Sequence, residues 1–104
     1  MIRKAFKFKL NPGQKEEYKK RHEELWPELE NLLKSAGIQD YSIFFDEATD
    51  SLFGILSIEN PENLDDLPKH PIMQKWWDYM ADIMEVNSDN SPKSIDLEKV
   101  FYMK

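Results

Sequence analysis

The sequence predicts an α+β fold in which two helical segments cover one face of a four-stranded antiparallel sheet. Three observations support this prediction: four segments have the pattern of strands, two longer ones have the spacing of amphipathic helices, and turn-forming residues separate them. With 104 residues, of which 40% are hydrophobic and 33% charged, the chain is expected to form a single domain, residues 1–104, around one core.

The first half of the chain predicts a strand followed by a long, interrupted helix. Residues 2–10 alternate between two sides, as a strand does. The stretch 11–14, NPGQ, has the asparagine and proline of a helix start, so a helix is expected from here to Ala36, which a glycine follows. Because Pro27 removes one helical hydrogen bond, this helix should kink or split there, with Trp26 at the bend.

The second half predicts a hairpin, a loop, a helix and a last strand. YSIFFD and SLFGILSIE are apolar segments separated by a short polar turn, which is typical of paired strands. NPENLDDLPKHP predicts a loop with one short helical turn, and NSDNSPKS an ordered turn or loop. The predicted boundaries are 41–46 and 51–59 for the hairpin strands, 60–71 for the loop, 72–85 for the helix, 87–94 for the turn and 97–103 for the last strand.

The order strand, helix, strand, strand, helix, strand is that of the ferredoxin-like βαββαβ fold, in which one face of the sheet has no helix over it. In the predicted hairpin both faces carry large apolar side chains, because Tyr41, Ile43 and Phe45 alternate with Phe44. A single chain would expose one of these faces to water. We therefore expect a homodimer in which two sheets pack together.

Charge and composition exclude several classes of partner and predict the compartment. The net charge of −6 argues against nucleic acid and anionic membranes as partners, since both attract basic proteins. The absence of cysteine excludes disulfides and thiolate chemistry and is typical of a reducing compartment. The N-terminal segment MIRKAFKFKL alternates instead of forming an apolar run, so we expect neither a signal peptide nor a membrane span, and a cytoplasmic location.

One face of the first helical segment changes from polar and aromatic to aliphatic along its length. Tyr18, His22, Leu25 and Leu29 follow one another at helical spacing, which is the arrangement that a pocket at one end of a helix would need. A buried histidine bonded to a backbone carbonyl explains His22 equally well. Tyr18, and Tyr41 on its strand, also fit ordinary half-buried tyrosines.

The second predicted helix carries more aromatic surface than packing requires. Methionines, isoleucines and one indole already form a sufficient apolar stripe, so Trp76 or Trp77 is left over. An indole offers a flat apolar face to the C–H side of a pyranose ring, while a histidine and tyrosines offer hydrogen bonds to hydroxyl groups. An aromatic wall with few polar groups favours a neutral, polyhydroxylated ligand.

Other site chemistries have little support in the sequence. The two histidines, His22 and His70, have no third ligand at a recognisable zinc spacing, so no metal site is expected. The three glycines are dispersed, which excludes a glycine-rich phosphate loop. No pair of Asp or Glu residues is distinguished by its spacing as the carboxylates of a glycosidase.

Seven stretches give the chain a resemblance to a known family over essentially its whole length. They are MIRKAF, EEYKKRH, WPELE, YSIF, WWDYM, NSDNSP and VFYM. The chain resembles the L-rhamnose mutarotases. This resemblance implies a dimeric α/β-barrel enzyme, an isomerase of rhamnose metabolism that interconverts the α and β anomers of L-rhamnose without a cofactor.

The resemblance also implies roles for five residues. His22 corresponds to the proton donor of the family, and the substrate contacts correspond to Tyr18, Tyr41, Trp76 and Trp77. A histidine exchanges protons near neutral pH, and a positioned acid or base commonly contributes roughly 10² to 10⁴ in rate. The partner base could be a water, a tyrosine or a carboxylate, and the residues leave this open.

Two alternatives remain at the level of the sequence. The same dimeric barrel architecture is also found in small monooxygenases that act on aromatic substrates or haem, an alternative that rests on fold analogy alone. In a non-catalytic sugar-binding module, the aromatic residues would bind the ligand without turnover. The segment NSDNSP could either close over a sugar or shape the entrance to its site.

Overall fold

The computed structural model describes all residues, 1–104. Its elements follow the chain in the order β1 (Ile2–Lys9), α1 (Lys15–Glu23), α2 (Pro27–Ser35), β2 (Ile38–Asp46), β3 (Ser51–Ile58), α3 (Asn63–Asp66), the 3₁₀ helix η1 (Leu67–Lys69), α4 (Pro71–Met80) and β4 (Ile95–Leu97). The strands form one antiparallel sheet in the order β2-β3-β1-β4. No helix is long and apolar enough to cross a lipid bilayer.

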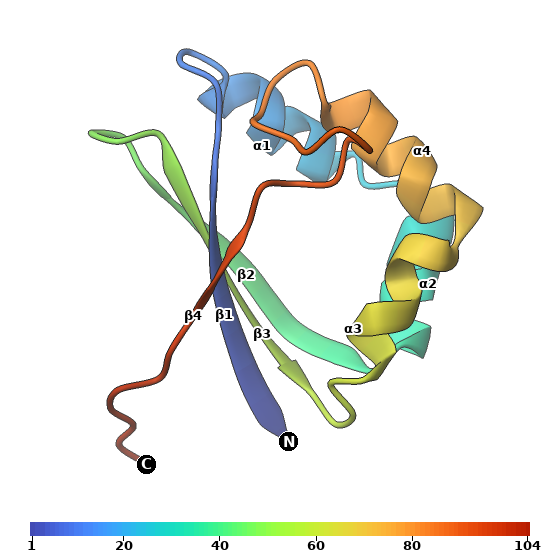
Figure 1. The fold of residues 1–104 in the computed structure, drawn as a ribbon, viewed down its shortest axis with the longest axis vertical. Helices are drawn as coiled ribbons and strands as arrows, with labels where there is room; N and C mark the ends of the chain where they lie inside the picture. The colour runs from blue at the N-terminus through green and yellow to red at the C-terminus, as the bar shows by residue number, and fades with distance from the viewer.

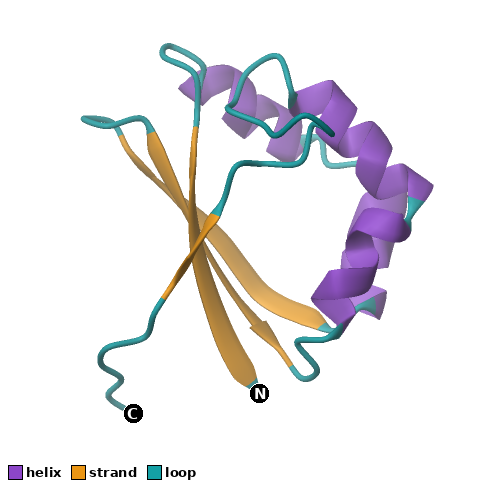
Figure 2. Ribbon diagram, viewed as in Figure 1, coloured by secondary structure: helices purple, strands orange, loops and turns teal.

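The molecule has two layers, a twisted sheet and a curved layer of helices on one side of it (Figures 1 and 2). The helices all lie over the same face of the sheet, which we call the inner face, and no helix covers the outer face (Figure 2). This arrangement confirms the predicted α+β, ferredoxin-like fold. Both chain termini lie on the sheet side of the molecule (Figure 1).

The helical break at Pro27 is confirmed, whereas the predicted helix start at residues 11–14 is wrong. α1 ends at Glu23 and α2 begins at Pro27, with Trp26 as the residue that caps α2. α1 itself begins only at Lys15, because Gly13 has a φ of 80°, a conformation that cannot be part of a right-handed helix. Residues 11–13 instead form the turn between β1 and α1.

The second predicted helix, 72–85, ends earlier than expected. α4 spans Pro71–Met80, and the chain then turns so that the backbone of residues 83–85 can pair with the end of β1. The amide of Glu85 donates to the carbonyl of Lys9, and the amide of Asn11 donates to the carbonyl of Ile83. These tertiary hydrogen bonds compete with continued helix, which the periodicity of the segment does not reveal.

The predicted last strand, 97–103, is also misplaced. β4 is only Ile95–Leu97, and it pairs with Ala5–Lys7 of β1. Beyond Leu97 the chain leaves the sheet (Figure 1), so residues 98–104 have no regular secondary structure and are exposed. In this single chain the apolar side chains of the tail have no core to pack against, which removes the main reason for the strand to continue.

The core lies between the inner face of the sheet and the helices. Its main cluster joins β1, β3, α1, α2 and α4, with Leu10 and Leu29 almost fully buried, and a smaller cluster surrounds Ile58 at the other end of the sheet. The outer face is different: Phe44 is 60% exposed and Ile95 is 65% exposed. The homodimer expected from this exposed apolar face remains a prediction.

Candidate active site

Helix α1 places Tyr18 and His22 one turn apart on the face that points toward α4. The two rings are stacked with their centroids 4.2 Å apart, and Nδ1 of His22 lies 2.9 Å from the backbone oxygen of Tyr18. Because a carbonyl oxygen only accepts hydrogen bonds, Nδ1 must carry a hydrogen and donate it. In the neutral ring, the lone pair is therefore on Nε2, which is the nitrogen available to a ligand.

The surroundings of His22 keep its imidazole neutral near pH 7. Burial lowers the pKa of His22 from its ordinary value of 6.5, because a buried ring loses the hydration that stabilises its charged form. The hydrogen bond to the carbonyl of Tyr18 opposes this effect only in part. The backbone bond to His22 was one of the two alternatives open from the sequence, and it leaves one ring nitrogen free for proton transfer.

Trp76 of α4 is the indole next to His22. Its ring meets the imidazole edge to face at 5.4 Å, and it meets the indole of Trp26 in the same way at 5.1 Å. Trp76 is buried, and these contacts lock its orientation. Trp77 is half-buried and packs against the edge of the core, without an aromatic neighbour. Of the two neighbouring tryptophans, only Trp76 contacts the predicted catalytic residue.

Tyr41 reaches the inner face of the sheet through a β-bulge. The pairing of β2 with β3 shifts between Gln39 and Ser42, so two residues of β2 lie opposite one residue of β3, and Asp40 adopts a φ of 51°. Tyr41, the second residue of the bulge, shares the inner face with Ile43 and Phe45, as the alternation predicts. The rings of Tyr41 and Phe6 of β1 meet at 6.0 Å.

Both tyrosines keep their hydroxyl protons under all physiological conditions. Burial raises the pKa of Tyr18 and that of Tyr41 well above the usual value of 10, and charge repulsion from Tyr41 raises that of Tyr18 further. Tyr18 and Tyr41 can therefore donate hydrogen bonds to a neutral ligand, whereas their ionisation is strongly disfavoured.

Several polar atoms of this region have no partner within the protein. The hydroxyl of Tyr18, Nε2 of His22 and Nε1 of Trp76 form no hydrogen bond with another residue, and yet the structure contains no fully buried side-chain nitrogen or oxygen that lacks a partner. These atoms must therefore be accessible to water. They are free to bind the hydroxyl groups of a ligand, and they come from α1 and α4.

Arg21 joins the two helices that carry these residues, and sequence reasoning missed it. Its side chain is only 11% exposed and bonds to Asp82 at 2.9 Å, to the backbone oxygen of Tyr79 at 2.8 Å and to Glu17 at 2.8 Å. The guanidinium also lies over the ring of Tyr79, 4.4 Å from its centroid. Arg21 lies in a run of charged residues, and no feature of the spacing distinguishes it from the neighbouring Lys19 and Lys20.

The predicted turn that follows α4 is ordered and is tied to this helix. Gln74 donates from its side chain to the backbone oxygen of Asp89 at 2.9 Å, and Asn90 donates to the carboxylate of Asp78 at 3.0 Å. Gln74 also donates to the carboxylate of Asp78 at 2.9 Å, and the bonds from Asn90 and Gln74 lower the pKa of Asp78, with Asn90 as the larger cause. The segment is therefore held against the side of α4 that carries Gln74 and Asp78.

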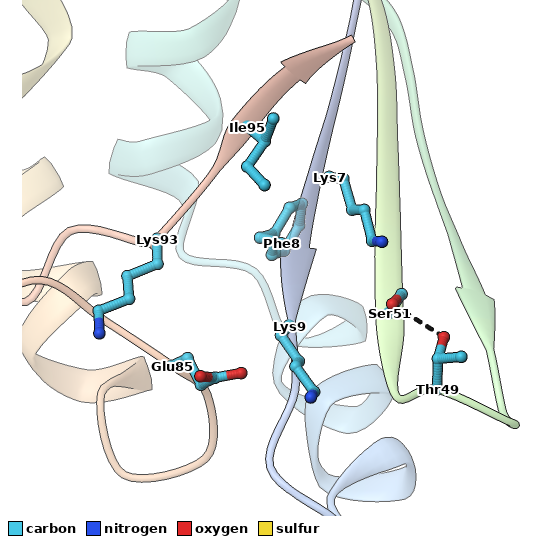
Figure 3. A pocket seen from close by; sticks show the side chains of 8 residues that line it. All are labelled: Lys7, Phe8, Lys9, Thr49, Ser51, Glu85, Lys93 and Ile95. Atoms are coloured by element: carbon cyan, nitrogen blue, oxygen red, sulfur yellow. Dashed lines mark hydrogen bonds between the residues drawn. The ribbon is translucent and has the colours of Figure 1, made fainter.

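A separate cavity does not coincide with these residues. It has a volume of about 350 Å³ and lies where β1, β4 and the β2–β3 turn meet (Figure 3). Its lining residues are Lys7, Phe8, Lys9, Thr49, Ser51, Glu85, Lys93 and Ile95. None of the five site residues expected from the sequence lines it, and the structure contains no cluster of three or more residues suited to bind a metal.

The fold and these residues define a small α+β protein in which a histidine on one helix lies between the aromatic rings of Tyr18 and Trp76. Residues 3–103 match the family model of L-rhamnose mutarotase. The L-rhamnose mutarotase of Formosa agariphila is 57% identical over 104 residues, covering 100% of both chains, and that of Brucella anthropi is 54% identical, covering 97% of this chain and 95% of the relative. The chain belongs to the L-rhamnose mutarotase family.

Solved structures agree with this assignment. The crystal structure of the Formosa agariphila L-rhamnose mutarotase superposes with a TM-score of 0.94 at 56% identity and covers 100% of both chains. A proposed antibiotic biosynthesis monooxygenase from Chloroflexus aurantiacus superposes with a TM-score of 0.52 at 13% identity, covering 99% of this chain and 98% of the other. This second likeness concerns the fold alone.

Proposed function

We propose that this protein interconverts the α and β anomers of L-rhamnose and that His22 transfers the proton. The observation that carries the proposal is the orientation of His22, whose Nδ1 is held by the carbonyl of Tyr18 while Nε2 stays free beside Trp76. The choice of L-rhamnose as the substrate is based on the relatives named L-rhamnose mutarotase, which are 54–57% identical to this chain. The reaction class is isomerisation, and it needs no redox partner.

In this mechanism the neutral imidazole acts first as a base. Nε2 of His22 accepts the proton of the anomeric hydroxyl, the bond between C1 and the ring oxygen breaks, and the ring oxygen takes up a proton as the aldehyde forms. Rotation about the C1–C2 bond presents the other face of the carbonyl. Ring closure reverses the transfers, so the imidazolium returns its proton to the new anomeric hydroxyl.

The lowered pKa of His22 supports this order of events and refines the role of proton donor that the resemblance implies. A histidine that is neutral at rest accepts a proton before it donates one. The raised pKa values of Tyr18 and Tyr41 argue against either tyrosine as the second proton carrier, because desolvation of each hydroxyl group disfavours the phenolate. We therefore propose that a water molecule relays the proton from the imidazolium to the ring oxygen, so that the water is neither consumed nor ionised and the imidazole becomes neutral again.

The remaining residues are proposed to bind the sugar. Tyr18 and Tyr41 would donate hydrogen bonds to its hydroxyl groups, and Trp76 would offer its apolar face to the C–H side of the ring. Trp77, at the edge of the core, would contact the 6-methyl side of the substrate. All four contacts suit a neutral, polyhydroxylated molecule with one apolar substituent.

The test is the rate at which freshly dissolved α-L-rhamnose equilibrates, followed by saturation transfer between the two anomeric proton signals. We expect the wild-type protein to accelerate exchange and the His22→Ala variant to lose about 10²- to 10³-fold of that acceleration. His70→Ala is a matched control, because His70 is exposed and its side chain makes no cap bond at α4. It should retain wild-type activity.

Three outcomes would contradict the proposal. Equal activity of His22→Ala and His70→Ala would remove His22 from the mechanism. Binding of L-rhamnose without faster exchange would favour a sugar-binding module. Oxygen consumption with an aromatic substrate would favour the monooxygenase alternative.

We also propose that the protein is a homodimer whose outer sheet faces pack together. Phe44 on β2 and Ile95 and Leu97 near the opposite edge are exposed, and the half-buried Phe53 and Ile55 lie between them on the same face. Burial of such a face is strongly favourable in water. Light scattering at micromolar concentration should give twice the mass of the chain, and Phe44→Glu should lower it; a monomeric wild-type mass would contradict the proposal.

A further inference from the structure

Gly54 lies at the centre of the sheet, under the ring of an aromatic residue. It belongs to β3 and pairs with Phe6 of β1 on one side and with Ile43 of β2 on the other. A Cβ atom at Gly54 would lie 2.5 Å from Cε2 and from Cζ of Phe6. The ring of Phe6 therefore occupies the space into which any other side chain at position 54 would point.

The conformation of Gly54 does not explain this residue. Its φ lies outside the left-handed region in which glycine is favoured, and glycine in the middle of a strand weakens the sheet. What glycine provides at this position is space. The space allows the Phe6 ring to lie across β3 instead of standing upright on β1.

The ring of Phe6 reaches from β1 to the site residue on β2. Its centroid lies 6.0 Å from that of Tyr41, with the two planes at 68°, and 5.6 Å from that of Phe8, with which it is stacked. Phe6 is half-buried and packs against both core clusters. It is thus supported on several sides, while Tyr41 is 39% exposed and is one of the two residues in the bulge of β2.

We propose that Phe6, seated on Gly54, is a positioning residue for Tyr41 in the L-rhamnose mutarotase reaction. Edge-to-face contact with Phe6 fixes the phenol ring, and with it the direction in which the Tyr41 hydroxyl meets the sugar. This inference rests on the proposed function, because Tyr41 is assigned as a sugar contact there. It adds Phe6 and Gly54 to the residues that determine how well the substrate binds.

The substitution Gly54→Ala tests the inference most directly. The new methyl group should displace the Phe6 ring and thereby Tyr41, so we expect KM for L-rhamnose to rise about tenfold while kcat stays within about twofold. Phe6→Leu removes the part of the side chain that clashes. In the double variant Phe6→Leu/Gly54→Ala, KM should therefore lie close to that of Phe6→Leu alone, well below the KM expected if the two effects multiplied.

A double-mutant cycle with Tyr41→Phe separates positioning from a merely structural role. Removal of the Tyr41 hydroxyl should raise KM severalfold in the wild-type background and much less in the Phe6→Leu background, where the hydroxyl is no longer held in place. Phe6→Leu is a conservative change that should fold even if Gly54→Ala does not. Circular dichroism and a thermal melt of each variant confirm folding.

The outcomes distinguish this inference from the proposed function itself. If wild-type protein does not accelerate anomer exchange, the proposed function fails. If wild-type protein is active and Tyr41→Phe raises KM by the same factor in both backgrounds, Phe6 does not position Tyr41 and only the present inference fails. An unchanged KM in folded Gly54→Ala would overturn it as well.

Discussion

The substitution Arg21→Met should weaken the attachment of α1 to α4. Methionine keeps most of the apolar stem and removes the guanidinium, which bonds to Asp82, to Glu17 and to the backbone oxygen of Tyr79. The variant therefore isolates the polar contacts from the packing of the side chain. It also tests whether the mutual position of His22 and Trp76 depends on this connection.

The magnitude follows from the exposure of each partner. The carboxylates of Asp82 and Glu17 are 67% and 42% exposed, so each ion pair contributes only about 0.5 kcal/mol. The bond to the oxygen of Tyr79 contributes about 1 kcal/mol, and the contact of the guanidinium with the Tyr79 ring roughly 0.5 to 1 kcal/mol. Arg21→Met should therefore lower the free energy of unfolding by about 2.5 to 3 kcal/mol.

The assay is urea denaturation, with thermal unfolding as a second measure. For a chain of this size the loss corresponds to a Tm lower by roughly 10 to 20 °C. Lys34→Met is the matched control, because it removes an ion pair to Glu30 in which both side chains are largely exposed, at 70% and 51%. We expect it to cost less than about 0.5 kcal/mol. Equal effects of the two substitutions would refute the reasoning, since burial of the Arg21 contacts would then have no consequence.

Three further predictions concern stability and binding. The pKa of folded His22 lies below 6.5, so protonation of His22 favours the unfolded chain, and the free energy of unfolding should fall as the pH decreases below 6.5. Urea titrations at pH 7.5 and 5.5 should show this decrease. An equal decrease in the His22→Gln variant would show that His22 is not its cause. Trp76→Phe should reduce both Tm and kcat, because Trp76 is buried against His22. Trp77→Phe should mainly raise KM. The reverse pattern in steady-state kinetics would show that Trp77, and not Trp76, is the indole that supports His22. Leu29→Ala should cost about 2 to 5 kcal/mol in urea denaturation, because Leu29 is only 1% exposed, and a loss under 1 kcal/mol would place it outside the core.

Local features of the sequence were sufficient for most of the secondary structure. Pro27 divides the first helical segment because it lacks an amide proton, and this effect does not depend on the rest of the molecule. The alternation of Tyr41, Ile43 and Phe45 likewise places them on one face of a strand. The errors lie where distant segments pair, as in residues 83–85, which bond to the end of β1 instead of continuing α4.

The candidate site follows a similar division. Spacing alone places Tyr18 and His22 one turn apart on α1 and marks the surplus indole on α4, and the seven matching stretches associate both with a sugar. Spacing does not show which indole meets the imidazole. Trp76 does so because α4 is rotated about its own axis so that Trp76 points toward His22 on α1, and the bond of Arg21 to the backbone of Tyr79 stabilises this arrangement.

By itself, the sequence determined the type and order of the elements, the uncovered face of the sheet and the family to which the chain belongs, because these depend on short-range periodicity and on residue identity. Only the tertiary structure decided which nitrogen of His22 is free, that Arg21 bonds α1 to the end of α4, and that the ring of Phe6 lies on Gly54 beside Tyr41. These features depend on distances between residues that are far apart in the chain. Such distances are set by the packing of whole elements, which no local pattern contains.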